Sequence, residues 1–179
     1  MNHAEGELLL DAGPVVLRTY TGAETEELVS LLRDPIVMRH ALYERPLSPV
    51  EAEQFVADQF AAGAWPGYAT VWLKETGRVV GFSGFRDCRY LGDSDVEFFW
   101  VISLESQGRG YATALGLELI RYGLESLRKP RVLAACNPRN VVSEHVLRDK
   151  LRMRFARDVE LSPVFHRRVY VAESVAVRP

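Results

Sequence analysis

The sequence predicts an α+β protein in which a mixed, mostly antiparallel sheet of seven strands is flanked by four helices. Two observations indicate this class. Short runs rich in β-branched and aromatic residues follow one another near both ends of the chain, and one strand-helix-strand unit lies between them. Successive strands favour antiparallel pairing, whereas a helical crossover favours a parallel pair. A chain of 179 residues, 47% of them hydrophobic, is expected to form a single domain over residues 1–179.

The first third of the chain predicts one strand and two helices. Residues 1–13 alternate poorly, so a loose terminus is expected there, and residues 15–20 predict the first strand. The first helix should end at Asp34-Pro35, because a residue before proline avoids helical geometry. Ser48-Pro49 is typical of a helix start and predicts a second helix that extends to Phe60. The irregular connection 36–46 either shapes a substrate site or is an ordinary loop.

The remaining strands alternate or form short apolar runs. The run after Asp95 is interrupted only by Glu97 and predicts a strand that is buried on both faces. The last two strands should form an antiparallel pair that turns at Ser162-Pro163. These six strands are expected at residues 68–74, 79–85, 96–102, 131–136, 155–161 and 165–177.

Two further helices complete the prediction. Apolar residues spaced three and four apart predict a helix from Tyr111 to Leu127 with one face on the sheet. Gly116 and Gly123 lie within that apolar face, so a close backbone approach is expected there. A shorter helix should open at Asn137-Pro138-Arg139-Asn140 and continue through Leu151.

The turn before Tyr111 has the features of an anion site. It contains Gln107-Gly108-Arg109-Gly110 between a buried strand and the start of a helix. Unpaired N–H groups converge at such a helix start, the dipole end is positive, and glycine lets a phosphate approach. The alternative is an ordinary strand-to-helix turn, which also favours glycine. The spacing lacks the Gly-Lys-Ser/Thr of a P-loop, and Thr113 stands where a dinucleotide fingerprint has its third glycine.

Composition excludes several other classes of function. The formal net charge of −2 favours neither nucleic acid nor an anionic membrane as a partner. No uncharged apolar stretch approaches 18 residues and the start lacks a signal peptide, so a cytoplasmic location is expected. Cys88 and Cys136 are far apart and the histidines have no metal-ligand spacing. We therefore expect no metal and no disulfide, and interpret Cys136 as a small buried hydrophobe.

The turn also resembles a known family. Gln107-Gly108-Arg109-Gly110-Tyr111-Ala112 is similar to the Gln/Arg-x-x-Gly-x-Gly/Ala signature of the GNAT N-acetyltransferases, in the family's position between the fourth strand and third helix. The longer run QGRGYATAL resembles the branch that contains ribosomal-protein N-terminal acetyltransferases. Asn140 and Ser143 resemble that branch's closing Asn-x-x-Ser motif, although Leu151-Arg152-Met153 replaces its usual Leu-Gly-Phe.

This resemblance implies that acetyl-CoA is the co-substrate. In the family the fourth and fifth strands splay apart, and pantetheine pairs in the gap with backbone groups, which here would belong to Trp100, Val101 and Ile102. The backbone N–H of Trp100 or of Val101 would then polarise the thioester carbonyl. The coenzyme diphosphate would bind the N–H groups and side chains of Gln107, Gly108, Arg109, Gly110, Tyr111, Ala112 and Thr113. Asn140 is expected to contact the coenzyme as well.

Two residues are candidates for proton transfer. Glu97 is the candidate base, because a carboxylate in an apolar strand is desolvated. The alternatives are that Glu97 forms a structural pair with an arginine, and that Asp95 or a water chain acts as the base. Ser143 is the candidate proton donor to the coenzyme sulfur, since Leu147 stands where much of the family has tyrosine. The alternative is that the Ser143 side chain only accepts hydrogen bonds from backbone N–H groups in the helix turn that Asn140 caps.

The predicted function is transfer of an acetyl group to a primary amine by direct attack. The acceptor is a protein N-terminus, a polyamine, an amino acid or an aminoglycoside, and the C-terminal strands are able to support a homodimer. The main alternative is a CoA-binding sensor without turnover, which the altered turn at Arg152 favours. A third interpretation is a nucleotide-phosphate binder of another fold, against which the Asn140 and Ser143 motif argues.

Overall fold

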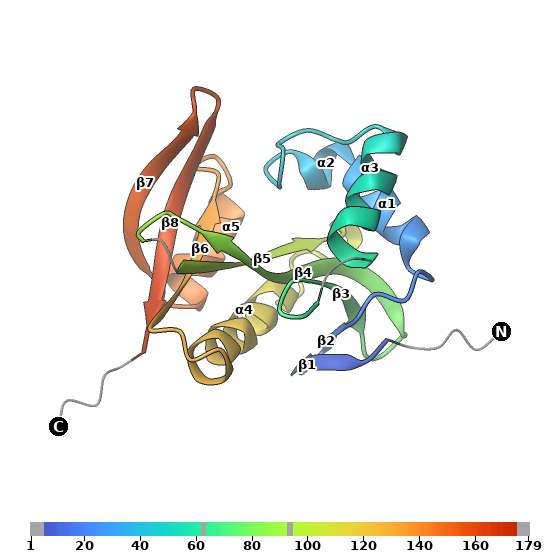
Figure 1. Ribbon diagram of the computed structural model, residues 1–179, viewed down its shortest axis with the longest axis horizontal. Coiled ribbons are helices and arrows are strands. Elements are labelled where there is room, and N and C mark those ends of the chain that lie inside the picture. The colour runs from blue at the N-terminus through green and yellow to red at the C-terminus, as the bar shows by residue number, and fades with distance from the viewer. Residues whose placement is uncertain (1–5, 62–63, 93–94, 175–179) are drawn as a thin grey trace.

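A mixed sheet organises the molecule. In the computed structural model, which describes residues 6–61, 64–92 and 95–174, eight strands pair in the order β1-β2-β3-β4-β5-β6-β8-β7. Helices pack on both faces of this sheet (Figure 1). The strands are β1 (Leu8–Ala12), β2 (Val15–Arg18), β3 (Tyr68–Leu73), β4 (Arg78–Cys88), β5 (Asp95–Ile102), β6 (Arg131–Cys136), β7 (Arg154–Ser162) and β8 (Phe165–Glu173). The predicted class is confirmed, but the strand count of seven is wrong.

The helices number five in the described part of the chain, not four. They are α1 (Thr25–Arg33), α2 (Pro35–Met38), α3 (Pro49–Val56), α4 (Tyr111–Arg121) and α5 (Val141–His145). A wide π-type turn prolongs three of them, at Ala57–Ala61, Tyr122–Ser126 and Val146–Lys150, and a 3-10 turn, Leu104–Ser106, follows β5. No helix among the described residues is long and apolar enough to span a membrane.

The two missing elements come from very short segments. β1 was expected to be part of a loose terminus, but it pairs with β2 across a tight turn at Gly13, whose φ is 75°. Its alternation is limited to Leu10 and Ala12, which are buried. α2 begins where α1 ends, because the Asp34 carboxylate accepts hydrogen bonds from the N–H groups of Ile36 (2.7 Å) and Val37 (3.1 Å).

Two strand ends also differ from the prediction. β4 continues to Cys88, three residues beyond the expected end. β8 ends at Glu173, and the part of the expected strand at residues 175–177 lies outside the described residues. The first of these differences matters for function, because the extension of β4 carries Arg86 alongside Glu97 of β5.

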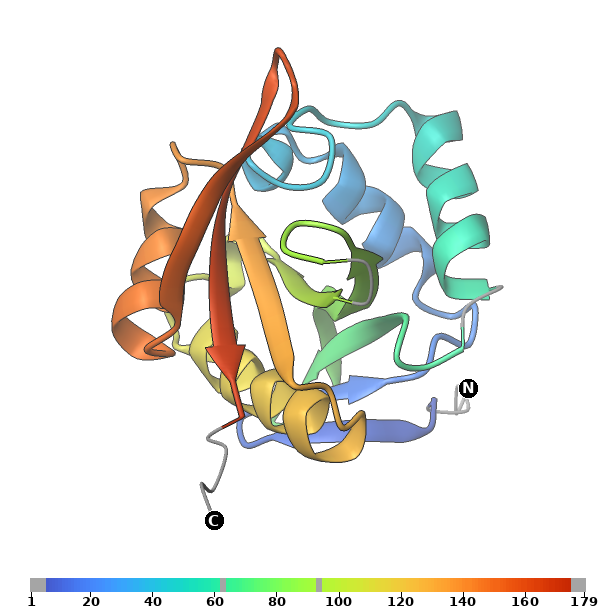
Figure 2. The ribbon, with the colours of Figure 1, turned by 60° about the vertical axis from the view of Figure 1, so that its left-hand side comes forward.

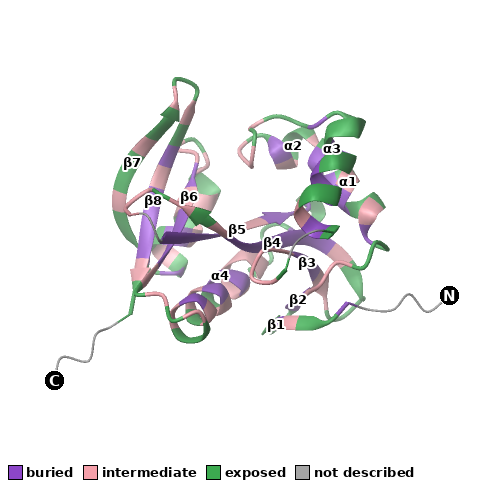
Figure 3. Cartoon of the chain, viewed as in Figure 1, coloured by how far each residue is buried: buried purple, intermediate pink, exposed green. Residues whose placement is uncertain are grey.

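The helices form two layers with separate cores. α4 covers one face, where Leu115 and Leu119 pack in the larger hydrophobic cluster (Figure 3). α1, α2 and α3 cover the other face, where Leu28, Phe55 and Met38 form a second cluster with Phe82 of β4. The sheet therefore separates a side that carries α4 from a side that carries α1 to α3.

The two glycines on the sheet-facing side of α4 and the turn after it permit close packing, but against side chains. A Cβ on Gly116 would lie 2.4 Å from Leu151 Cδ1, and one on Gly123 would lie 2.3 Å from Val132 Cγ1. The expected close approach is thus real, and its partners are Leu151 and Val132 rather than a neighbouring backbone.

The sheet opens between β5 and β6. β4 and β5 pair along eight residue pairs, from Gly81↔Ile102 to Cys88↔Asp95. In the described chain β5 and β6 run parallel and pair only at Glu97↔Leu133. Beyond this pair the two strands diverge, which is the expected splay. Their separated ends create the opening in which the candidate site lies.

Candidate active site

The first turn of α4 presents unpaired N–H groups. Gly110 caps the helix with a φ of 83°, Gly108 has a φ of 71°, and no side chain caps this end. Within the described chain, the N–H groups of residues 108–113 have no hydrogen-bond partner; the first bonded amide is that of Ala114, which donates to Gly110 O at 3.0 Å. Free N–H groups at the positive end of a helix of 11 residues favour an anion.

Gln107 contributes differently from its neighbours. Its backbone N–H donates to Leu104 O at 3.2 Å and its side-chain Nε2 donates to Ile102 O at 3.0 Å. The residue therefore braces the turn against the end of β5, and the free N–H groups begin at Gly108. Arg109 also folds back on the turn, because its Nε donates to Glu105 O at 3.2 Å.

A groove of about 610 Å³ begins at these N–H groups. This volume lies in the range of small-molecule sites. The end of β5 and the start of α4 form its floor, while α2 and α5 line its sides. The groove also contains cationic side chains that the sequence did not single out individually as ligands; they are Arg39, Arg139 and Lys150.

A second, smaller cavity of about 90 Å³ adjoins the groove. Both share the same residues at the splay between β5 and β6: His40, Ala41, Trp100, Val101, Asn140 and Ser143. From this junction the small cavity continues to Arg86, Glu97 and Arg167. The two cavities therefore form one path. Of the predicted site residues, Trp100, Val101, Asn140 and Ser143 lie at the junction, whereas Glu97 lines only the small cavity. The predicted ligands of the diphosphate, except Arg109, line only the groove.

Strand alternation decides which backbone groups of β5 face this junction. Ser103 N donates to Val80 O at 2.8 Å, and Phe99 O accepts from Ser83 Oγ at 2.6 Å, so both residues face β4. Val101 lies between them with the same orientation, whereas Trp100 and Ile102 face the gap. The expected pairing with a bound molecule is thereby limited to Trp100 and Ile102. Val101 lines the junction, and its side chain is buried.

Glu97 is buried and ion-paired on the side of the sheet that carries α1 to α3. Its side chain is 1% exposed, and Oε2 accepts from Arg86 Nε at 2.9 Å. Burial lowers the pKa of Arg86, but the Glu97 carboxylate more than offsets this effect and leaves the pKa above its usual value. Burial and the same carboxylate raise the pKa of Tyr90. Glu97 therefore has the arginine partner that the structural interpretation required, while still lining the small cavity.

Asp95, the alternative base, lies apart from this cavity. Its carboxylate pairs with Arg131 Nε at 2.6 Å and accepts from Leu91 N at 3.2 Å. It lines neither the groove nor the small cavity. The geometry therefore favours Glu97 over Asp95 for contact with a reacting group.

Asn140 caps α5 and leaves the Ser143 hydroxyl free. Asn140 Oδ1 accepts from Ser143 N at 3.2 Å, which confirms the predicted cap. Within the described residues the Ser143 Oγ has no hydrogen-bond partner, and Ser143 lines both cavities. Leu147, one turn later, is buried with 1% exposure and supplies no polar group. The hydroxyl is thus available at the junction.

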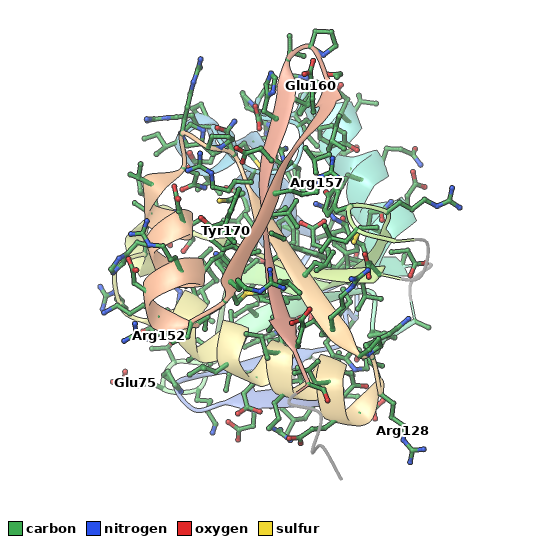
Figure 4. All side chains as sticks on the ribbon, turned by 90° about the vertical axis from the view of Figure 1, so that its left-hand side faces the viewer. Glu75, Arg128, Arg152, Arg157, Glu160 and Tyr170 are labelled. Carbon is green, nitrogen blue, oxygen red and sulfur yellow. The ribbon has the colours of Figure 1, made fainter. Side chains whose placement is uncertain are left out.

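Glu144 fixes α5 on the sheet, a contact that the sequence did not reveal. Its Oε1 accepts from Tyr170 Oη at 2.8 Å and from Arg168 Nη1 at 2.9 Å, both on β8. The hydrogen bond from Tyr170, followed by that from Arg168, lowers the pKa of Glu144. Figure 4 shows Tyr170 between β8 and α5. Because Ser143 precedes Glu144, this contact sets the position of the free hydroxyl.

The turn after α5 forms although its glycine is replaced. Arg152 has a φ of 57°, in the left-handed region that favours glycine. Met153 N donates to Leu147 O at 3.0 Å, and both Leu151 and Met153 are buried. Arg152 itself points away from the sheet (Figure 4). The chain thus keeps the turn and accepts a strained residue at it. Among the described residues, no three His, Cys, Asp or Glu side chains converge as a metal site.

Known proteins share this architecture. An acetyltransferase from *Bacillus anthracis* (GNAT family) has 20% sequence identity, covering 95% of this chain and 98% of that one with a TM-score of 0.76. RimL, a ribosomal L7/L12 α-N-protein acetyltransferase solved with coenzyme A, has 12% identity, covering 93% and 98% with a TM-score of 0.73. These likenesses show a common fold.

The sequence comparisons identify the family. An uncharacterised N-acetyltransferase of *Bacillus subtilis*, YnaD, is 32% identical over 66 residues, which is 37% of this chain and only 38% of that relative. The family model described as the acetyltransferase (GNAT) domain matches residues 15–153, and this span contains the groove, the splay and the free N–H groups of α4. The chain therefore belongs to the GNAT acetyltransferase family.

Proposed function

We propose that this protein transfers an acetyl group from acetyl-CoA to a primary amine by direct attack of the amine. The observation that carries the proposal is the continuous path from the free N–H groups of residues 108–113, through the splay, to the cavity at Glu97. A diphosphate fits the first part of this path and an extended, amide-containing chain fits the gap. The acetyl group would then lie at the junction.

The groove supplies contacts for each part of the coenzyme. The N–H groups from Gly108 to Thr113 bind the diphosphate, and the Thr113 hydroxyl adds a donor. Arg39, Arg139 and Lys150 surround the groove and offset the negative charge of the phosphates. Asn140 uses its Oδ1 for the helix cap, so its Nδ2 remains to donate to the bound molecule.

Three groups along this path perform the chemistry. The Trp100 N–H, which faces the gap, donates to the thioester oxygen and stabilises the charge that develops there. The Ser143 hydroxyl gives a proton to the departing thiolate, and its position is fixed by Glu144. The Glu97 carboxylate takes a proton from the amine, directly or through water, and its ion pair with Arg86 orients it.

The turn at Arg152 no longer favours a sensor without turnover. That alternative depended on loss of the glycine after α5, but the turn is formed and Leu151 is buried beneath it. The acceptor is a protein or peptide N-terminus or a small amine. The resemblance of the run QGRGYATAL to the branch of ribosomal-protein N-terminal acetyltransferases favours the first of these acceptor classes.

The test is release of free thiol from acetyl-CoA across a panel of peptides and small amines. We expect release with at least one class of acceptor, and a decrease in kcat of about 100-fold or more in Ser143→Ala and Glu97→Gln. Ser126→Ala and Glu75→Gln, at exposed positions outside both cavities, serve as controls with unchanged kcat. Binding of CoA without release from any acceptor would contradict the proposed catalysis.

A further inference from the structure

We propose that Glu44, Asn137 and Arg167 form a strap over the acceptor end of the site, and that this strap restricts acceptors to amines with a slim head group. The inference rests on the proposed acetyl transfer, and it identifies the part of that site that selects the acceptor. These three residues come from distant parts of the sequence: the loop between α2 and α3, the segment after β6, and β8.

The strap is a set of largely buried polar contacts. Glu44 Oε1 forms an ion pair with Arg167 Nη1 and also accepts from Asn137 Nδ2 at 2.7 Å. Arg167 Nη2 donates to Leu42 O at 3.2 Å. The side chains of Arg167 and Glu44 are only 8% and 17% exposed. Such contacts are costly to break, because each partner would be left buried without its counterpart.

The strap connects the two sides of the opening in the sheet. Figure 2 shows the loop after α2 beside the part of the β7–β8 hairpin that lies toward its turn, and Glu44 contacts Arg167 there. Leu42 and Arg167 line the small cavity together with Glu97. The strap therefore lies beside the place at which an acceptor must approach the junction with the groove.

The loop adopts its conformation at a cost, which indicates that the contacts hold it there. Leu42 has a φ of 46° and Glu44 a φ of 58°, both in the left-handed region although neither is glycine. Glu44 N donates to Ala41 O at 2.7 Å and closes the turn between them. Strained residues of this kind persist where surrounding contacts determine the conformation. Here the Arg167 side chain bonds both strained residues.

The space left beneath the strap is small. The cavity has a volume of about 90 Å³, against about 610 Å³ for the adjoining groove. Sites that enclose whole small molecules usually have about 300 Å³ or more. Only the amino group and a narrow segment next to it fit beside Glu97, so the rest of the acceptor must extend outward.

The charged side chains that line the small cavity are already paired. Arg167 pairs with Glu44, and Arg86 with Glu97, so each cation in the cavity faces a carboxylate. An acceptor with an additional charge near its amine would have to displace one of these pairs. Selection of the acceptor therefore depends mainly on the width of the group next to its amine. At the first position of a peptide acceptor, Gly, Ala or Ser should be favoured over Leu, Phe or Trp.

The experiment measures kcat/KM for peptides that differ only in the first residue. In the wild type we expect Gly, Ala and Ser peptides to exceed Leu, Phe and Trp peptides by at least tenfold. Glu44→Ala should reduce this ratio at least fivefold, because the strap opens. Glu44→Gln keeps an acceptor oxygen for Arg167 and Asn137 and should keep most of the ratio. Arg45→Ala is the matched control, since it removes an exposed ion pair of the same loop, Arg45–Glu51 at 2.7 Å.

A second measurement does not depend on activity or on the choice of acceptor. Hydrogen exchange of the amides of residues 40–45 should be at least tenfold faster in Glu44→Ala than in Arg45→Ala or the wild type. Equal kcat/KM for slim and bulky peptides in the wild type, or unchanged exchange in a folded Glu44→Ala, would overturn the strap. If Glu44→Ala does not fold, Asn137→Ala takes its place under the same criteria. Failure of all acceptors, with exchange as expected, would instead contradict the proposed acetyl transfer.

Discussion

Replacing Gly110 with alanine tests the anion site at the start of α4. Gly110 has a φ of 83°, and a Cβ added there would meet nothing within 4 Å, so the cost comes from the backbone conformation alone. A left-handed residue other than glycine costs about 1–2 kcal/mol, and alanine recovers about 0.4–1 kcal/mol by restricting the unfolded chain. The net loss in free energy of unfolding should be about 1 kcal/mol, which lowers Tm by about 2–4 °C.

Gly77 provides a matched control for this substitution. It lies in the turn between β3 and β4 with a φ of 63°, and a Cβ there also meets nothing within 4 Å. Gly77→Ala should therefore lower Tm as much as Gly110→Ala does. Only Gly110 lines the groove, where the added methyl group occupies space next to the free N–H groups.

The assay is calorimetric titration of both variants with CoA. We expect the Kd of Gly110→Ala to rise at least tenfold, equivalent to about 1.4 kcal/mol, while that of Gly77→Ala stays at the wild-type value. A second titration with dephospho-CoA, which retains the diphosphate, should show the same ratio between the variants. Equal CoA affinity in two variants that have lost the same stability would refute the assignment of the diphosphate to these N–H groups.

Four further predictions concern stability and reactivity. Arg152→Gly should raise the free energy of unfolding by up to about 1 kcal/mol in denaturant titrations and leave kcat unchanged, because it relieves a left-handed φ at an exposed position. Gly123→Ala should lower the free energy of unfolding by about 1–2 kcal/mol in the same assay, although alanine has the higher helix propensity. The reason is that Val132 Cγ1 would lie 2.3 Å from the new Cβ, and a β-branched side chain has little freedom to move. Burial raises the pKa of Cys88 and of Cys136 to about 11, so iodoacetamide at pH 8 should modify the native thiols far more slowly than the unfolded ones. These pKa values lie above the ordinary value of 9.0, so the thiols favour unfolding as the pH rises from about 9 to about 11. Urea titrations at the two ends of this pH range should show a lower free energy of unfolding at the higher pH. This decrease should be smaller in Cys136→Ser than in the wild type.

The fold was predictable where the sequence pattern is long and local. The helix from Tyr111 and the buried strand before it have sustained periodicity, and both were placed correctly. β1 has five residues at the edge of the sheet and α2 has four, so neither presents enough repeats to be recognised. The partners of Gly123 were also hidden, because contact with Val132 depends on how β6 packs and leaves no mark near the glycine.

The site was predictable only in its parts that are contiguous in the sequence. The glycine-bearing turn and the Asn140 cap are local patterns, and the structure contains both. Strand alternation separates Trp100 from Val101 only once the hydrogen bond from Ser103 N to Val80 O is known, and the sequence does not show that bond. By contrast, the Glu44–Arg167 pair joins residues 123 positions apart, and nothing near either residue indicates the other.

The single residue pair that joins β5 to β6 gives a bound coenzyme a structural role. With one rung between them, β1–β5 and β6–β8 amount to two small sheets that share the helical layer formed by α4 and the turn after it. In the proposed complex, the extended, amide-containing part of acetyl-CoA would lie in the opening and supply hydrogen bonds that the two strands do not make with each other. The coenzyme would then act as an additional strand that ties the two halves of the sheet together.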